Sequence, residues 1–195
     1  MKQLEEWRER IGKRPVTKYE LWIAVPFCMA VFLLAEGSFS ERLPSLFYVW
    51  LLFPALEDAV SGYMTDVWWI MLLAAGLVYR TVNGTFFEGI LACLLCSLLL
   101  GIPFFIRPGS IGSGDVCFAS AIGFWLTPLT ALFFIWLSSV LCLFLFFILT
   151  LVSQQSVSSP IRFGPCLALA GGISYGAAQW LSDILVSWSA GISLY

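Results

Sequence analysis

Long apolar runs separated by short polar connections dominate the sequence. A spanning helix needs roughly 20 consecutive apolar residues, and fewer where its ends are irregular. The apolar runs end at connections that contain glycine, proline or charged residues, and no internal repeat or interdomain linker separates them. The expected fold class is therefore all-α, a polytopic transmembrane helix bundle of about six to seven helices. The pattern predicts membrane-crossing segments at about residues 21–36, 44–57, 67–82, 86–106, 116–127, 129–152 and 164–187.

The composition strengthens this expectation. Of the 195 residues, 60% are hydrophobic and 11% are charged. A soluble domain usually carries about 45–50% apolar and about 25% charged residues. Because a chain of this size cannot bury so much apolar side chain in a core of its own, the bilayer must act as its solvent. Residues 21–195 are therefore expected to form one membrane-embedded domain.

The basic residues are concentrated at the start of the chain. Six of the ten lie in residues 1–20, mixed with four glutamates, which predicts a short amphipathic segment ahead of the first span. Since basic residues stay on the cytoplasmic side, we expect a multi-pass protein of the bacterial cytoplasmic (inner) membrane with a cytoplasmic N-terminus. Alternation of the spans then places the connections 58–66 and 107–115 on the same cytoplasmic face.

The sequence contains no histidine, which excludes several classes of enzyme. There can be no Ser-His-Asp or Cys-His nucleophile and no HExxH zinc site. Acid–base chemistry must then use carboxyl or other groups whose pKa values are shifted. Most of the six cysteines lie in apolar runs, and packing explains even Cys93 and Cys96, spaced as in a CxxC motif, better than a metal or redox site.

Two aspartates stand at the cytoplasmic ends of apolar segments. Asp58 follows the predicted span 44–57, ahead of a turn that contains Gly62. Asp115 follows a glycine-rich run over residues 109–114 and directly precedes the next apolar segment. Glycines let a backbone approach another chain closely and leave amide groups free to bind one. From the residues alone, two interpretations stay open: a pair of catalytic carboxyls, or a plain loop residue at 58 and a helix cap at 115.

Three short motifs give the sequence a family resemblance. Residues 112–116 read Gly-Ser-Gly-Asp-Val, and Asp58 precedes Thr65 and Asp66 by seven and eight positions. Residues 160–168 read Pro-Ile-Arg-Phe-Gly-Pro-Cys-Leu-Ala and include a Phe-Gly-Pro segment. In this order they resemble the GxGD motif, the D-x6-P-[DN] pattern and the PFGP-like segment of type IV prepilin peptidases, over about residues 45–175. The resemblance implies an intramembrane aspartic peptidase with Asp58 and Asp115 as its catalytic residues.

Two positions depart from the family pattern. Thr65 stands where the family usually has proline, which should only loosen a turn. Cys117 stands where a lysine is usual, and the loss of that cation next to Asp115 could alter substrate contact or mark an inactive relative. The chain also lacks the insertion with paired CxxC motifs that accompanies N-methylation in many bacterial members. It resembles the minimal form of preflagellin and Tad-pilus peptidases, which implies cleavage without methylation.

The resemblance implies the mechanism of aspartic proteases, in which two carboxyls share one proton. The ionised carboxylate would activate a water, the protonated one would bind the scissile carbonyl, and no metal or organic cofactor is needed. The substrate would be a prepilin-like protein, a type IV pilin or pseudopilin precursor with a basic leader before a hydrophobic helix. Membrane lipid is the other expected partner, and nucleic acid is not expected.

The expected substrate contacts are of two kinds. The backbone of the glycine-rich segment could pair with an extended leader. Two acidic side chains could bind basic leader residues, although simple solvation at the interface explains them equally well. These five residues are Gly112, Ser113, Gly114, Glu57 and Asp66.

Three alternatives compete with this interpretation. A small transporter would use Asp58, Asp115 and Asp183 as ion ligands, although no inverted repeat is visible. A non-catalytic membrane assembly factor would retain the fold, and Cys117 is its main support. A presenilin-like protease shares the GxGD motif, but Tyr63 lies on the wrong side of Asp58 for its second pattern.

Overall fold

The computed structural model describes residues 39–62, 64–107, 111–153 and 162–192. The chain divides into two compact units, residues 1–46 and 47–195, and each is considered by itself. In the first unit the described part is the beginning of one helix, residues 39–46. The predicted amphipathic segment 1–20 and the first predicted span, 21–36, lie outside the described residues.

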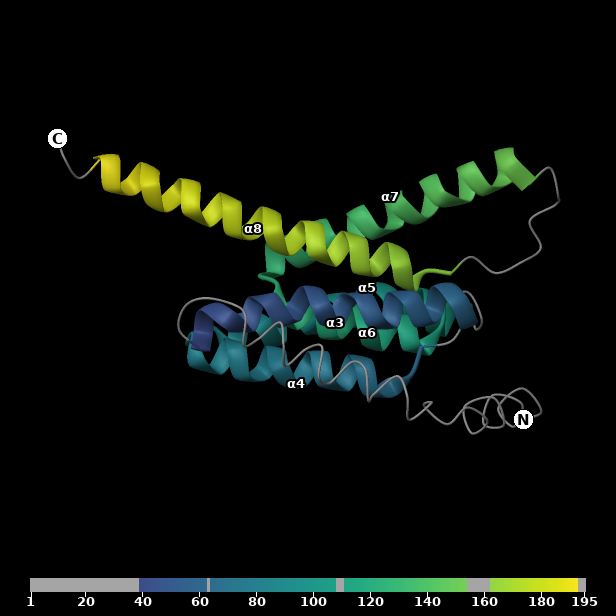
Figure 1. Cartoon of the computed structure of the whole chain (residues 1–195), viewed down its shortest axis with the longest axis horizontal. Helices are drawn as coiled ribbons and strands as arrows, with labels where there is room; N and C mark the ends of the chain where they lie inside the picture. Colours follow the sequence, from purple (N-terminus) through teal and green to yellow (C-terminus); the bar gives the residue numbers. More distant parts are fainter. Residues whose placement is uncertain (1–38, 63, 108–110, 154–161, 193–195) are drawn as a thin grey trace. The chain divides into compact units, whose positions relative to one another are not determined.

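The described part of the chain is entirely helical and contains no strand, which confirms the all-α prediction. Each of its helices overlaps one of the predicted apolar segments (Figure 1). The helices are α3 (Phe39–Ser61), α4 (Asp66–Val82), α5 (Phe86–Ile106), α6 (Ser113–Trp125), α7 (Pro128–Ser153) and α8 (Gly164–Ile192).

Two of these helices are long and apolar enough to cross a bilayer by length and composition. They are α5, Phe86–Ile106, with a mean hydropathy of 2.5, and the stretch Pro128–Leu151 of α7, with a mean hydropathy of 2.8. A helix satisfies its own backbone hydrogen bonds, as a segment in lipid must. Both helices match segments that the hydropathy pattern predicted.

The end of α3 lies later than the sequence pattern predicted. The predicted connection 58–66 is wrong in its first part, because the helix continues through Asp58 to Ser61. It stops at Gly62, whose φ of 70° is a left-handed conformation that glycine adopts without strain. The Gly62 N–H donates to the Asp58 carbonyl oxygen at 2.9 Å, which closes the last turn. The actual connection to α4 is therefore short, residues 62–65.

Helix α6 is largely buried from Phe118 to Trp125 and contacts α4, α5 and α8. Glycines on its neighbours and on itself make this close packing feasible. A Cβ at Gly76 of α4 would lie 2.6 Å from the indole nitrogen of Trp125, and a Cβ at Gly123 would lie 2.6 Å from the Cys96 sulfur. The Trp125 indole N–H donates to the Leu72 carbonyl at 2.9 Å, so the ring is both packed and hydrogen-bonded.

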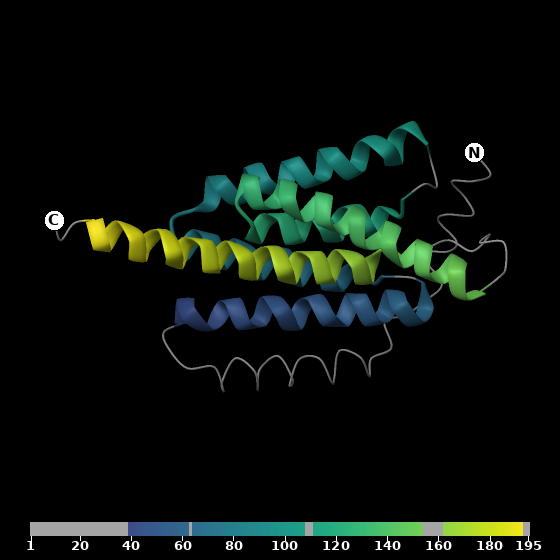
Figure 2. The same ribbon diagram turned by 90° about the horizontal axis from the view of Figure 1, so that it is seen from above.

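Helix α8 runs next to α7 and next to the part of α3 that begins at Phe47 (Figures 1 and 2). Aromatic contacts hold α3 and α8 together. The ring centroids of Phe47 and Tyr175 are 4.6 Å apart, and those of Tyr48 and Tyr175 are 5.9 Å apart. This packing brings the start of α8 alongside the end of α3.

A buried arginine binds the C-terminal end of α6. Arg80, only 5% exposed, donates from Nε to the Phe124 carbonyl at 3.2 Å and from Nη2 to the Trp125 carbonyl at 2.9 Å. Its Nη1 donates to the Thr85 hydroxyl at 3.0 Å and lies 3.6 Å from the Glu88 carboxylate. The last carbonyls of a helix lack hydrogen-bond donors within it and form the negative end of its dipole. Arg80 provides both hydrogen-bond donors and a positive charge at this end.

Replacement of Arg80 should therefore destabilise the fold. We expect Arg80→Met to lower the free energy of unfolding by about 2–3 kcal/mol, because two buried carbonyls lose their donors. Arg107→Met is the matched control: Arg107 is exposed, and its replacement should change stability by no more than about 0.5 kcal/mol. Thermal unfolding of both variants in detergent measures the difference. Equal midpoints for the two variants would contradict the capping role.

Candidate active site

Asp58 is a buried carboxyl in the last turn of α3. Its side chain is 8% exposed, and its Oδ2 accepts a hydrogen bond from the backbone N–H of Gly164 at 3.0 Å. Gly164 is the first residue of α8, a helix of 29 residues. The first N–H groups of a helix have no partner within it, and they form the positive end of its dipole. This end of α8 therefore favours the ionised form of Asp58.

Only glycine fits at position 164 in this arrangement. A Cβ there would lie 2.7 Å from Asp58 Oδ2, 2.9 Å from its Cβ and 3.1 Å from its Cγ. These distances are shorter than ordinary van der Waals contact, and the obstructing atoms belong to a short side chain on a packed helix. The glycine of the Phe-Gly-Pro segment thus lets α8 approach Asp58 closely enough to bind its carboxylate.

Asp115 lies in the first turn of α6, not ahead of it. The N-cap of α6 is Gly112, with φ −71° and ψ 143°, so Asp115 is the third residue of the helix. Its carboxyl is half-buried and receives a backbone hydrogen bond from Gly112. A Cβ at Gly114 would lie 3.7 Å from the Cβ of Met64, which places the GxGD segment against the connection 62–65 that follows Asp58.

The two carboxyls lie close enough for the charge of one to act on the other, and their surroundings differ. Burial, and then the negative charge of Asp58, raise the pKa of Asp115 to about 7, although the hydrogen bond from Gly112 opposes this. Burial also raises the pKa of Asp58, but the hydrogen bond from Gly164 and the charge of Arg162 oppose it. Both carboxyls lie outside the predicted spans 44–57 and 116–127. The arrangement therefore favours loss of the proton from Asp58 before Asp115.

Arg162 supplies the cation at this site. It is exposed, precedes α8, and lies next to the turn after α3, since a Cβ at Gly62 would be 3.9 Å from its Nε. The sequence placed Arg162 on the cytoplasmic side but did not link it to Asp58, because only the folded chain brings the start of α8 to the end of α3. The role of Gly164 was missed for the same reason. The Phe-Gly-Pro segment marked the position, but not its contact with Asp58.

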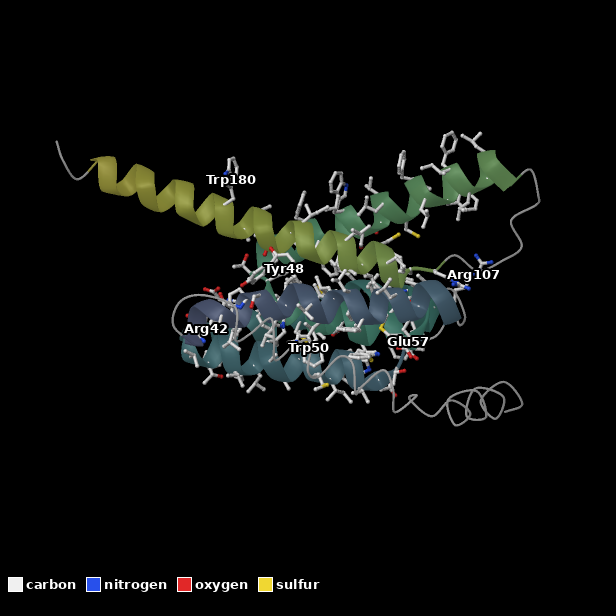
Figure 3. The ribbon with its side chains drawn as sticks, in the orientation of Figure 1. Arg42, Tyr48, Trp50, Glu57, Arg107 and Trp180 are labelled. Atoms are coloured by element: carbon white, nitrogen blue, oxygen red, sulfur yellow. The ribbon has the colours of Figure 1, made fainter. Side chains whose placement is uncertain are left out.

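The predicted substrate contacts differ in their exposure. Gly112 is exposed, and Ser113 and Gly114 are half-buried at the start of α6. Asp66 is exposed and accepts a hydrogen bond from the indole N–H of Trp69 at 3.0 Å. Glu57 lies at the end of α3 from which the chain passes to α4 (Figure 3). Residues 109–110 of the predicted glycine-rich run lie outside the described residues.

The carboxylate of Glu57 is engaged within the protein. It accepts a hydrogen bond from the Thr65 N–H at 2.9 Å and another from the Thr65 hydroxyl.

Cys117, which stands where the family pattern usually has a lysine, is half-buried and within electrostatic range of Asp66. No group of three or more acidic or cysteine side chains suited to a metal ion occurs among the residues that the structure describes.

Comparison with known families identifies one family that matches the chain. The sequence profile of the type IV leader peptidase family matches residues 45–147, which is more than half of the chain. The matched stretch contains both Asp58 and Asp115. No curated protein and no solved structure matches the chain.

Gly164→Ala tests the close approach of α8 to Asp58. The substitution keeps the N–H donor but places a Cβ against the carboxyl, so we expect a loss of about 1–3 kcal/mol in the free energy of unfolding. Gly101→Ala is the matched control, because a Cβ at that helical glycine meets nothing within 4 Å and should stabilise the helix by about 0.5–1 kcal/mol. Thermal unfolding of the two variants should shift in opposite directions. A shift in the same direction would show that steric contact at 164 is not limiting.

Proposed function

The chain belongs to the type IV leader peptidase family, as its three motifs predicted, and from this membership together with the paired carboxyls we propose that it is an intramembrane aspartic endopeptidase. The single observation that carries the proposal is the pairing of Asp58 and Asp115 in unequal surroundings. An aspartic protease needs one ionised and one protonated carboxyl at the same site. Burial, a helix N-terminus and a neighbouring arginine favour that division here.

The mechanism follows from the two protonation states. Ionised Asp58 removes a proton from a water molecule, and the resulting nucleophile attacks the scissile carbonyl carbon. Protonated Asp115 donates a hydrogen bond to the carbonyl oxygen as negative charge develops on it. Proton transfer to the leaving amine then completes cleavage. The two carboxyls and one water supply all of this chemistry.

The membrane setting is the second part of the proposal. Apolar side chains cover the outer face of α7, where Leu129 is 77%, Trp136 60% and Leu143 69% exposed. Exposed apolar surface of this extent needs a cover, and lipid provides one. With α5 and α7 as spanning helices, we propose a multi-pass bundle of six to seven helices in the bacterial inner membrane, its N-terminus in the cytoplasm.

The proposed substrate is a prepilin-like precursor with a basic leader ahead of a hydrophobic helix. The exposed backbone at Gly112 and the exposed carboxylate of Asp66 support this, because they offer groups to an extended, basic peptide. Cleavage would occur at the cytoplasmic face, at the junction between leader and helix. Because the sequence contains no paired CxxC insertion, we propose cleavage without N-methylation.

The direct test is co-expression of the chain with a prepilin-like precursor and measurement of leader removal. Wild type should cleave, whereas Asp58→Asn and Asp115→Asn should each reduce the rate by about 10²–10⁴-fold while still inserting into the membrane, because each removes one acid–base group. Asp183→Asn is the control, and it should cleave at close to the wild-type rate.

Other outcomes would assign a different function. If Asp183→Asn lowers the rate of leader removal as much as the other two variants do, the result favours the transporter interpretation and contradicts the proposed peptidase. If wild type removes no leader from any precursor, a non-catalytic assembly factor fits better, and Cys117→Lys then shows whether the missing cation is the cause.

The rate of cleavage should also depend on pH with a defined sign. Because the pKa of Asp115 is about 7, this residue loses its proton as pH rises through that value, and kcat/KM should fall about tenfold for each further pH unit. At low pH the rate should fall again as Asp58 gains a proton. Cleavage assays across this range, with intrinsic fluorescence to exclude unfolding, measure the profile. A rate that stays constant well above neutrality would contradict the assignment of the proton to Asp115.

A further inference from the structure

Two hydrogen bonds tie the end of α3 to the start of α4. The carboxylate of Glu57, in the last turns of α3, accepts both the N–H and the hydroxyl of Thr65, the N-cap residue of α4. The two residues are eight positions apart and enclose the connection 62–65. Charge-assisted bonds of this kind are stronger than neutral ones. We call this pair of bonds the Glu57–Thr65 clasp.

The connection that the clasp closes touches both catalytic carboxyl segments. At its start, the Gly62 N–H is bonded to the Asp58 carbonyl. Next to Thr65, Met64 lies against Gly114, the residue before Asp115. A shift of this connection would therefore move the backbone at Asp58 relative to the first turn of α6.

The backbone at Thr65 has the conformation of a proline. Its φ is −76° and its ψ is 135°, and a proline ring holds φ at about −65° ± 15°. A proline could thus stand here without moving the chain, but it would have no N–H to offer to Glu57. The clasp and a proline are two different ways to hold the same backbone, and each makes the other unnecessary.

We propose that Glu57 is a positioning residue for the aspartyl pair, and that its bonds to Thr65 perform the task that a proline at position 65 would perform. The proposal deepens the proposed function and rests on it. It assigns Glu57 to the internal geometry of the site, in place of the contact with basic leader residues that the sequence first indicated. Asp66, whose side chain is exposed, remains available for that contact.

A double-variant cycle in full-length protein tests the proposal with the precursor cleavage assay. Glu57→Ala should lower kcat by about tenfold or more with KM within about twofold, because misplaced catalytic groups slow the chemical step. Thr65→Pro combined with Glu57→Ala should restore kcat to within about threefold of wild type, since the ring then holds the connection. Glu57→Gln keeps an acceptor for the Thr65 N–H without the charge, and should retain at least about half of kcat.

The opposite pattern would overturn the proposal. If Glu57 contacts the leader through its charge, Glu57→Ala and Glu57→Gln should raise KM alike, only for precursors with basic leaders, and Thr65→Pro should not rescue either variant. A double variant that cleaves no faster than Glu57→Ala alone would also contradict the proposal.

Hydrogen exchange provides a measurement that needs no substrate. In detergent, the Thr65 amide should exchange about tenfold faster in Glu57→Ala than in wild type, because it loses its acceptor. An unchanged rate at Thr65 would overturn the clasp. This result stands even if wild type cleaves no precursor, which would instead contradict the proposed function.

Discussion

The hydrogen bond from the Gly164 N–H to the Asp58 carboxylate is the contact on which the site depends. A buried carboxylate is costly unless hydrogen bonds and a favourable field compensate. Here the start of α8 provides both, and it can do so only because position 164 lacks a Cβ. The bond joins α8 to α3 and favours the charged state of Asp58. Burial, and then that charge, make ionisation of Asp115 unfavourable, so this contact contributes to the different roles of the two carboxyls in the proposed mechanism.

The sequence predicted the helices well because hydrophobicity decides them. The segment at 86–106 was predicted to the residue, since polar residues bound an apolar run on both sides. The end of α3 was misplaced for the converse reason. Asp58 is acidic and is followed by polar residues and Gly62, and a hydropathy pattern assigns such residues to a connection. The helix nevertheless continues until Gly62, where the backbone turns into the left-handed region.

Only part of the candidate site could be predicted from the sequence. Asp58 and Asp115 were identifiable by resemblance to short motifs. Their partners were not, because these are backbone groups or residues far along the chain: Gly164 lies 106 positions from Asp58. Arg80 shows the same limit, since its partners are two carbonyls 44 and 45 positions away. Thr65 was noted only as a departure from a pattern, and its bonds to Glu57 give that departure a physical meaning.

In the proposed membrane setting, the shortness of α6 has a consequence for the surrounding lipid. With 13 residues, this helix extends roughly 20 Å, whereas the hydrocarbon layer of a bilayer is about 30 Å thick. Asp115 near one end and Arg80 against the other prevent either end from sinking into hydrocarbon. In the proposed setting the mismatch must be met by local thinning of the bilayer or by the neighbouring helices. Where the bilayer is thinned, a peptide bond beside a hydrophobic helix has a shorter distance to cover before it reaches water and the two carboxyls. A protease that cuts its substrate at the membrane boundary has to bring these three together.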